Sequence, residues 1–273
     1  MSTNTVDKPR KVTVNTLRKM KAEGEKIAML TSYDYNMAQL VDGAGIDIIL
    51  VGDSATNVMA GNATTLPMTL DEMIYHSRCV AHGAQRAFVV ADMPFGSYQV
   101  NGDEAMRSAI RLMKEAGVEG VKLEGGRDIV PIIKRLTSAG IPVMGHVGLT
   151  PQSVNQLGGY GIQGKTDAAA QAMIADAHAL EEAGCFAIVL EKVPAALAEE
   201  VSKQLTIPTI GIGAGAGTDG QVLVINDMLG MNTGFRPKFL RLYANLAEVI
   251  DGAVKHYIDD VKSAAFPTPD ESY

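Results

Sequence analysis

The chain has 273 residues, of which 47% are hydrophobic, and its 24 basic and 31 acidic side chains give a formal net charge of −7. An acidic chain without a cluster of Lys and Arg lacks the charge pattern of proteins that bind nucleic acid or anionic membrane surfaces. The longest apolar runs, such as residues 48–51, fall far short of the roughly 18 residues that span a bilayer. We therefore expect a globular protein that binds neither nucleic acid nor a membrane.

The beginning of the chain and its cysteines predict a cytoplasmic, reduced protein. The first dozen residues lack the apolar segment of a secretory signal. Cys79 and Cys185 are far apart and lack metal-ligand spacing, so we expect both to act as small hydrophobic residues. No linker or low-complexity stretch divides the chain. The predicted organisation is a polar arm over residues 1–13, one domain over residues 14–266 and a polar tail over residues 267–273.

Eight short apolar runs rich in β-branched residues recur along the chain, each followed by a Gly or polar cluster and then by a stretch with helical periodicity. Six of the seven gaps between them are long enough for the helical crossover that joins parallel strands. The gap before the last run is short and rich in glycine, so no full helix is expected there. The predicted strands are residues 27–32, 47–52, 87–91, 120–123, 142–145, 186–190, 208–211 and 221–225.

Continuously apolar runs are typical of parallel strands buried on both faces, and eight β/α repeats close most economically into a barrel. We therefore predict a single-domain α/β fold, a (β/α)8 TIM barrel, with an open doubly wound sheet as the alternative. Thr69 with Glu72, and Asn101 with Glu104, have the spacing of capping boxes at helix starts. The glycines that stand where helices would end are Gly117, Gly140 and Gly184.

Acidic residues follow three consecutive predicted strands. Asp53, Asp92 and Glu124 end the second, third and fourth runs, and the C-terminal ends of barrel strands converge on one site. Any one of them alone is better explained as a helix cap or a solvated loop residue, but three close carboxylates repel one another unless a cation holds them. All-oxygen donors favour a hard ion, Mg²⁺ before Mn²⁺. The set predicts a metal site.

The fourth run alternates apolar and charged residues, so Lys122 and Glu124 are expected on the same side of their strand. Three roles are open to Lys122: an ion pair with Glu124, a Schiff base, or an anchor for an anionic substrate. A Schiff base requires a depressed pKa, whereas neighbouring carboxylates raise it. We therefore expect Lys122 to hold the carboxylate of a substrate.

Two further strand ends carry groups suited to proton transfer or substrate binding. Glu191 ends the sixth run, away from the metal trio, and is expected to act as a general base. A salt bridge to adjacent Lys192 is the alternative. His146 stands between two glycines after the fifth run, where it either hydrogen-bonds a substrate oxygen or is satisfied by the backbone.

Glycines and long loops complete the pattern. The run at residues 211–215 resembles a phosphate-binding turn, yet Ala216 departs from G-x-G-x-x-G, and tight packing explains the glycines equally well. The connections over residues 54–68 and 147–166 are long for this architecture, which favours lids over the site.

Seven strings of the sequence closely resemble the ketopantoate hydroxymethyltransferase family, and the resemblance runs from about Val14 to Phe266. The strings are VGDS (51–54), ADMPF (91–95), KLEGG (122–126), GHVGLTPQSV (145–154), GGYGIQGK (158–165), VLEKVP (189–194) and GIGAG (211–215).

The resemblance implies a Mg²⁺-dependent, cytoplasmic (β/α)8 barrel that assembles as a homodecamer. It implies transfer of a one-carbon unit from 5,10-methylenetetrahydrofolate to 3-methyl-2-oxobutanoate, giving 2-dehydropantoate on the route to pantothenate. It also assigns roles by motif match. The implied metal residues are Asp53, Asp92 and Glu124, the substrate contacts are Ser54, Asp92 and Lys122, and the base is Glu191.

Residues 55–57 and 62–63 depart from the family pattern, which bears on substrate preference and leaves the metal and base positions unchanged. Two other functions are weighed against this one. A Mg²⁺-dependent lyase or mutase of the phosphoenolpyruvate mutase or isocitrate lyase type is expected to carry a reactive Cys in a mouth loop, where this chain has none. A non-catalytic ligand-binding barrel does not need metal and base residues together.

Overall fold

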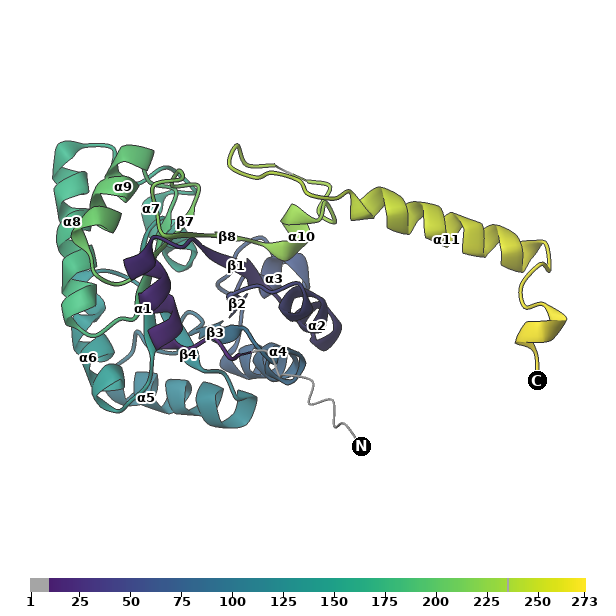
Figure 1. The fold of residues 1–273 in the computed structure, drawn as a ribbon, viewed down its shortest axis with the longest axis horizontal. Helices are drawn as coiled ribbons and strands as arrows, with labels where there is room; N and C mark the ends of the chain where they lie inside the picture. Colours follow the sequence, from purple (N-terminus) through teal and green to yellow (C-terminus); the bar gives the residue numbers. More distant parts are fainter. Residues whose placement is uncertain (1–9, 235) are drawn as a thin grey trace, which may run out of the picture. The chain divides into compact units, whose positions relative to one another are not determined.

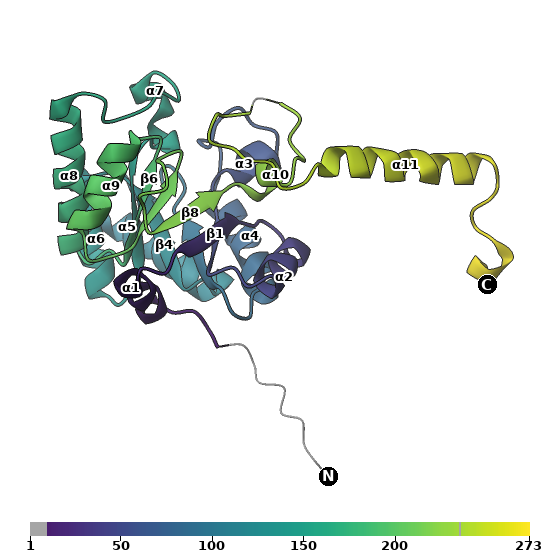
Figure 2. The same ribbon diagram turned by 45° about the horizontal axis from the view of Figure 1, so that its top comes forward.

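The computed structural model describes residues 10–234 and 236–273, which divide into two compact units after Val224. The first unit is a closed barrel of eight parallel strands in sequential order (Figures 1 and 2). The predicted (β/α)8 barrel is therefore confirmed, and the open sheet is wrong. The strands are β1 Ile27–Thr31, β2 Ile48–Val51, β3 Phe88–Asp92, β4 Gly120–Glu124, β5 Val143–Gly148, β6 Ala187–Glu191, β7 Thr209–Ile212 and β8 Gly220–Leu223.

Helices connect the strands around the outside of this barrel (Figure 1). Residues 213–219, between β7 and β8, contain no helix, as their glycine content predicts. The helical elements of the first unit are α1 Val14–Glu23, α2 Tyr35–Gly43, α3 Ala55–Val58, α4 Leu70–Gly83, α5 Gly102–Arg111, the π-turn η1 Leu112–Ala116, η2 Arg127–Ile129, α6 Val130–Ser138, η3 Pro151–Ser153, α7 Val154–Leu157, α8 Asp167–Glu182 and α9 Ala195–Gln204.

One of the two predicted capping boxes forms. Thr69 and Glu72 exchange reciprocal hydrogen bonds at the start of α4, as expected. The Asn101 side chain accepts from the backbone at the start of α5, but Glu104 pairs with Arg107 at 2.6 Å instead of returning to Asn101. The second box is therefore wrong, and Asn101 is a simple N-cap. The three predicted helix-end glycines, Gly117, Gly140 and Gly184, all have left-handed φ angles.

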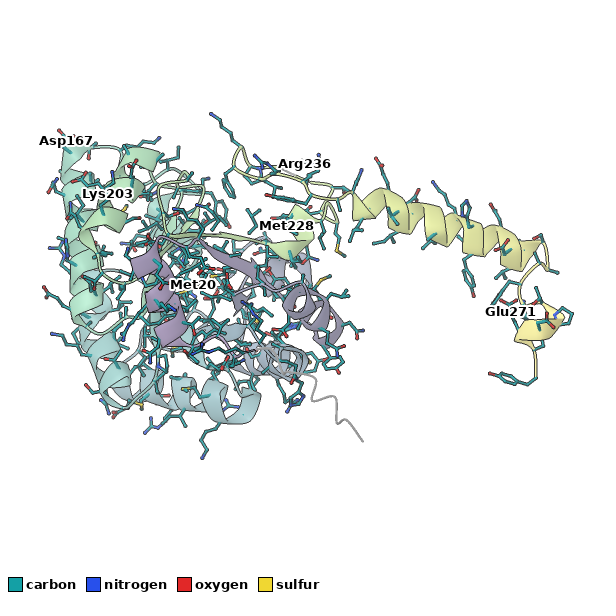
Figure 3. All side chains as sticks on the ribbon, in the orientation of Figure 1. Met20, Asp167, Lys203, Met228, Arg236 and Glu271 are labelled. Atoms are coloured by element: carbon teal, nitrogen blue, oxygen red, sulfur yellow. The ribbon has the colours of Figure 1, made fainter. Side chains whose placement is uncertain are left out.

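The barrel interior is apolar toward the N-terminal ends of the strands and charged toward their C-terminal ends. Alternate strand residues such as Met29, Phe88 and Val189 form one buried cluster, and α1 adds Leu17 and Met20 to it (Met20 is labelled in Figure 3). Further along the strands, the inward positions become Asp, Lys, Glu and His. This is the usual layered packing of a barrel, with reactive groups at the C-terminal end.

The fifth strand is longer than the sequence predicts. It continues to Gly148 because residues 144–148 pair in parallel with β6, so His146 lies inside the strand. Glu124 pairs with His146 in register, and Asp92 with Lys122. These pairings bring side chains from adjacent strands to the same height in the barrel.

The second unit contains α10 Ile225–Met228, α11 Leu246–Lys262 and the turn η4 Pro269–Glu271. In α11, apolar residues such as Ile250, Val254 and Val261 recur with helical spacing. The barrel strands are complete before this unit begins, and the domain limits at residues 13 and 266 stay predictions. Within the described part of the chain, no helix is long and apolar enough to cross a membrane.

Candidate active site

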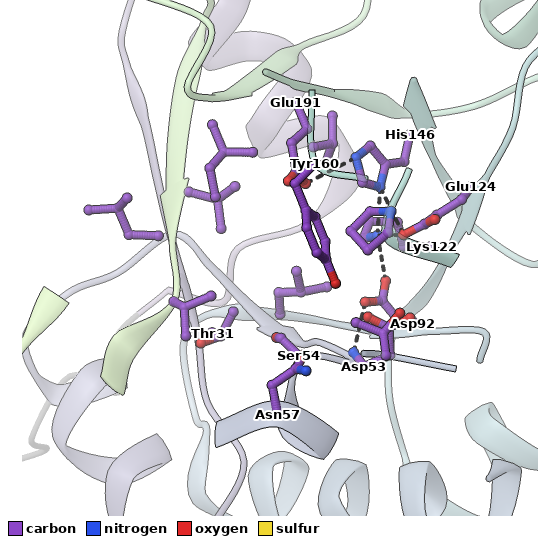
Figure 4. Close-up of a pocket in the computed structure, with 18 residues that line it drawn as sticks. Thr31, Asp53, Ser54, Asn57, Asp92, Lys122, Glu124, His146, Tyr160 and Glu191 are labelled. Atoms are coloured by element: carbon purple, nitrogen blue, oxygen red, sulfur yellow. Dashed lines mark hydrogen bonds and ion pairs between the residues drawn. The ribbon is translucent and has the colours of Figure 1, made fainter. Parts of the chain in front are cut away.

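A cavity of about 160 Å³ opens at the C-terminal ends of the strands (Figure 4). Each predicted site residue lines it, so strand-end reasoning locates the site, while the individual roles stay predictions. The predicted site residues in its wall are Asp53, Ser54, Asp92, Lys122, Glu124, His146 and Glu191.

Two aspartates form the deep wall of the cavity. Asp53 closely follows β2 and Asp92 ends β3, and both are buried. The Asp53 backbone N–H donates to Oδ2 of Asp92 at 3.0 Å, which fixes the two residues next to each other. Burial, together with the carboxylates of Asp92 and Glu124, raises the pKa of Asp53 well above its ordinary value. The deep wall therefore gathers carboxyl groups that disfavour one another's ionisation.

Lys122 supplies positive charge inside this acidic cluster. Its Nζ lies 2.7 Å from Oδ1 of Asp92 and 4.0 Å from Oε1 of Glu124. Burial lowers the pKa of Lys122, but the carboxylates of Asp92, Glu124 and Asp53 outweigh burial, and the net pKa is raised. The side chain is thus an ammonium, and it pairs with carboxylates as one of the three predicted roles requires. A Schiff base needs a neutral amine, so the geometry argues against that role.

His146 lies between two carboxylates. Its Nδ1 is 3.4 Å from Oε1 of Glu124 and 3.1 Å from Lys122 Nζ, while its Nε2 is 3.4 Å from Oε2 of Glu191. Burial and Lys122 lower the pKa of His146, but the interactions with Glu124 and Glu191 prevail and raise it to about 9. Both ring nitrogens therefore face protein groups. This arrangement supports a role in holding the two glutamates, and substrate binding by His146 stays a prediction.

Gln152 is a functional candidate that sequence reasoning missed. It lies on η3, is only 5% exposed, and donates from Nε2 to Oδ2 of Asp53 at 2.9 Å. Its backbone N–H donates to Oε2 of Glu124 at 2.9 Å, and its Oε1 accepts from the hydroxyl of Tyr98 at 3.0 Å. One residue of the loop after β5 therefore orients two of the three predicted metal carboxylates. The signals in the sequence that could have found it are its place in a long connection and in the string GHVGLTPQSV (145–154).

Gln152→Met keeps the length of the side chain but removes both the amide donor to Asp53 and the acceptor for Tyr98. Leaving buried polar groups unsatisfied typically costs about 1–3 kcal/mol, so we expect a loss of that size in the free energy of unfolding by urea. Gln99→Met is the matched control, since exposed Gln99 donates to the same Oε1 at 3.2 Å. An equal loss in both variants would show that the bond between Gln152 and Asp53 is unimportant.

The residues that depart from the family pattern bond to one another. Asn57 on α3 donates from Nδ2 to the backbone oxygen of Asn62 at 2.8 Å, and Asn62 donates from Nδ2 to Oγ1 of Thr56 at 2.7 Å. Asn57 and Thr65 of the same connection also line the cavity. The departures therefore form one hydrogen-bonded unit at the wall of the cavity, in a loop that the sequence predicts to be a lid.

Close packing accounts for two glycines of the run at 211–215. A Cβ on Gly211 would lie 2.7 Å from Oγ1 of Thr218, and a Cβ on Gly215 would lie 2.5 Å from Cβ of Ala195. Side chains at these positions would displace their neighbours. Of the two interpretations of this run, tight packing is the one that the structure supports.

The long connection after β5 is fastened to the end of β6. Leu149 N–H donates to the oxygen of Glu191 at 2.8 Å, and Gln163 N–H donates to the oxygen of Lys192 at 2.9 Å. Lys192 has a left-handed backbone with φ +47°, and its Nζ donates to the backbone oxygen of Tyr160. Lys192 thus binds the loop, and no ion pair between Lys192 and Glu191 occurs among the described residues.

The three predicted metal residues, Asp53, Asp92 and Glu124, line one cavity, but their side chains are not arranged as a coordination site. Within residues 10–234 and 236–273, no group of three His, Cys, Asp or Glu side chains is arranged to hold a metal ion. The oxygens of Glu124 face His146 and Gln152, and the Lys122 ammonium lies 2.7 Å from Oδ1 of Asp92. The donor chemistry still fits a hard divalent ion, because the site's carboxyl groups outnumber its two basic side chains.

Comparison with known proteins identifies the family. The family model described as ketopantoate hydroxymethyltransferase matches residues 11–269. The chain belongs to this family. The ketopantoate hydroxymethyltransferase assignment covers nearly the whole chain, and the prediction of a hydroxymethyltransferase is confirmed.

Curated members of the ketopantoate hydroxymethyltransferase family are very similar to this chain. A 3-methyl-2-oxobutanoate hydroxymethyltransferase of Bacteroides fragilis is 64% identical over 267 residues, which are 98% of each chain. One of Porphyromonas gingivalis is 61% identical over 273 residues and covers 100% of both chains.

Solved structures of more distant proteins share the barrel of this ketopantoate hydroxymethyltransferase family member. Phosphonopyruvate hydrolase, in a complex with oxalate and Mg²⁺, has a TM-score of 0.61 at 15% identity and covers 95% of this chain and 93% of its own. 2,3-Dimethylmalate lyase, a phosphoenolpyruvate mutase/isocitrate lyase superfamily member, has a TM-score of 0.59 at 17% identity, with 96% and 91% covered. At these identities the likeness shows the fold alone.

The cysteines argue against a lyase or mutase that uses a thiol. Cys79 lies in α4, and buried Cys185 lies shortly before β6. Burial raises the pKa of Cys185 to about 12, so it is not a thiolate at neutral pH. Neither cysteine lines the cavity.

Proposed function

We propose that this protein transfers a hydroxymethyl group from 5,10-methylenetetrahydrofolate to 3-methyl-2-oxobutanoate and so forms 2-dehydropantoate. One observation carries the proposal beyond family membership: a buried ammonium and a carboxylate at the edge of the cavity face the same small space. The ammonium of Lys122 suits an anionic oxo acid, and the carboxylate of Glu191 suits a proton acceptor. A ligand-binding barrel without catalysis has no need for both.

The oxo acid would bind against the deep wall. The Lys122 ammonium attracts its carboxylate, and the hydroxyl of Ser54 can donate to one of its oxygens. Ser54 is held in place because its Oγ lies 2.8 Å from the hydroxyl of buried Tyr33. A substrate held by both Lys122 and Ser54 would bind in one pose, and the proposal requires that this pose direct C3 toward Glu191 on β6.

Glu191 would take the proton from C3 of the oxo acid. Its carboxylate is only 17% exposed, and His146 holds one of its oxygens from the interior side. The C–H bond at C3 breaks as its proton moves to Glu191, and C3 bonds to the methylene carbon of the folate while the bond from that carbon to one folate nitrogen breaks. Water then replaces the second nitrogen on this carbon and becomes the hydroxyl group. The two folate nitrogens take up one proton from Glu191 and one from water, and tetrahydrofolate leaves. The chain's part is to hold, orient and deprotonate.

A divalent cation, Mg²⁺ by family resemblance, would be held by Asp53, Asp92 and Glu124. When bound, it supplies positive charge where the keto oxygen becomes negative. The excess of carboxyl groups and the raised pKa of Asp53, which comes from burial and its acidic neighbours, both support a further cation here.

A turnover assay with both substrates and detection of 2-dehydropantoate tests the proposal. We expect EDTA-treated protein to be inactive and added Mg²⁺ to restore activity. Asp53→Ala and Asp92→Ala should fold but lose the Mg²⁺-dependent activity by about 100-fold or more, a size usual for loss of an electrostatic group from an active site. Asp71→Ala, at an exposed position of α4, is the control. Full activity in EDTA would refute the metal, and absence of product would refute the reaction.

The family resemblance also supports a homodecamer and a cytoplasmic location. Analytical ultracentrifugation of the purified chain tests the assembly, and a single species near ten times the 28.9 kDa chain mass is the expected result.

A further inference from the structure

We propose that Tyr160 forms the donor subsite, with its ring as a stacking platform for the flat pteridine of the reduced folate. This inference rests on the proposed function and adds to it the residue that receives the second substrate. It starts from an aromatic side chain that lines the cavity while remaining 47% exposed.

The cavity has two chemically different sides. Its deep side, with Asp53, Asp92 and Lys122, is buried and charged, which suits a small anion. Figure 4 draws the Tyr160 ring across the middle of the cavity, below Glu191 in that view. The ring is the largest aromatic surface among the lining residues, so it is the natural contact for a planar heterocycle.

The backbone of Tyr160 is tied to the residue that follows the base. Lys192 Nζ donates to the backbone oxygen of Tyr160, and Gln163 N–H donates back to the oxygen of Lys192 at 2.9 Å. Lys192 directly follows Glu191 in the chain. A pteridine stacked on Tyr160 would therefore bring its one-carbon unit to the side of the cavity where C3 loses its proton.

The size of the cavity supports the same arrangement. About 160 Å³ accommodates a small oxo acid, whereas a reduced folate is several times larger and must extend outward through the opening. Half-exposed aromatic rings at an opening gain from stacking because every flat heterocycle offers a π-face.

Tyr160→Leu tests the platform, with Tyr160→Phe as the variant that keeps the ring. Loss of one aromatic stack typically weakens binding by about 10-fold to 100-fold. We expect Tyr160→Leu to raise the KM for methylenetetrahydrofolate and the Kd for tetrahydrofolate, measured by calorimetry, by that factor. The KM for the oxo acid should change less than about twofold. Tyr160→Phe should behave like the wild type, as should the control Tyr75→Leu at an exposed position of α4.

A second readout separates this role from that of a lid over the oxo acid. Exchange of the C3 proton with D₂O in the absence of folate should be unchanged in Tyr160→Leu. An unchanged Kd for tetrahydrofolate in Tyr160→Leu would overturn the proposal. So would a fall in the rate of proton exchange as large as the loss of affinity for tetrahydrofolate. Wild-type protein that binds tetrahydrofolate through Tyr160 but forms no 2-dehydropantoate would contradict the proposed reaction and leave the subsite supported.

Discussion

Glu191→Gln is expected to slow the exchange of the C3 proton of 3-methyl-2-oxobutanoate with D₂O by about 10²-fold to 10⁴-fold, the usual contribution of a positioned general base. Gln has nearly the same shape but cannot accept the proton. The reaction is run with Mg²⁺ and without folate, because deprotonation precedes formation of the carbon–carbon bond. NMR of the C3 proton signal follows the exchange directly.

Substrate binding gives this experiment its internal check. The Kd for the oxo acid should stay close to that of the wild type, since Lys122 and Ser54 hold the substrate in the proposed pose. Glu200→Gln, at an exposed position of α9, is the matched control and should exchange normally. Undiminished exchange in Glu191→Gln would move the base elsewhere. His146 would be the next candidate, although its pKa, raised to about 9 against burial by Glu124 and Glu191, keeps it protonated at neutral pH.

Lys122→Met is expected to lower the free energy of unfolding by about 3–5 kcal/mol, the cost of removing one partner from a buried ion pair. The variant leaves Asp92 and Glu124 buried without their ammonium partner. It should also lose the affinity for the oxo acid. Lys203→Met is the control, because Lys203 on α9 (labelled in Figure 3) forms a solvent-exposed ion pair with Glu199. That surface variant should unfold like the wild type.

In metal-free protein, the loss in the free energy of unfolding caused by Lys122→Met should depend on pH. Burial and the neighbouring carboxylates raise the pKa of Asp53, while Lys122 lowers it, so removal of Lys122 raises it further. An acid whose folded-state pKa exceeds its unfolded value of about 3.9 loses stability as the pH rises. The difference in the free energy of unfolding between Lys122→Met and the wild type should therefore shrink as the pH is lowered from about 8 to about 5. A difference that grows over this interval would contradict the proposed charge balance.

The strand-end residues were predictable because two simple rules apply to them. Side chains alternate along a strand, and parallel barrel strands end on one face, so Asp92, Lys122 and Glu124 had to meet. It was harder to predict from the sequence which carboxylate Lys122 contacts. Strand register places Asp92 beside Lys122, and register follows from the closed barrel rather than from any local motif.

Loop residues of the site escaped prediction for a different reason. Gln152 and Tyr160 belong to a connection whose path is set by tertiary contacts with Asp53, Glu124 and Lys192. Both lie in strings that resemble the family, but nothing in those strings indicates the part that either residue plays, and a polar amide or a tyrosine in a glycine-rich loop is ordinarily a surface residue. The closure of residues 147–166 over bound substrate stays a prediction.

Lys192 combines an unfavourable backbone conformation with a contact that fastens the loop over residues 147–166. Its left-handed backbone, with φ +47°, costs an ordinary residue about 1–2 kcal/mol that glycine would avoid. Glycine, however, has no ammonium to reach the loop carbonyl of Tyr160. A residue with a long cationic side chain in a backbone conformation suited to glycine is therefore a local compromise. Attempts to make this enzyme more heat-resistant by relieving its strained positions should spare this one.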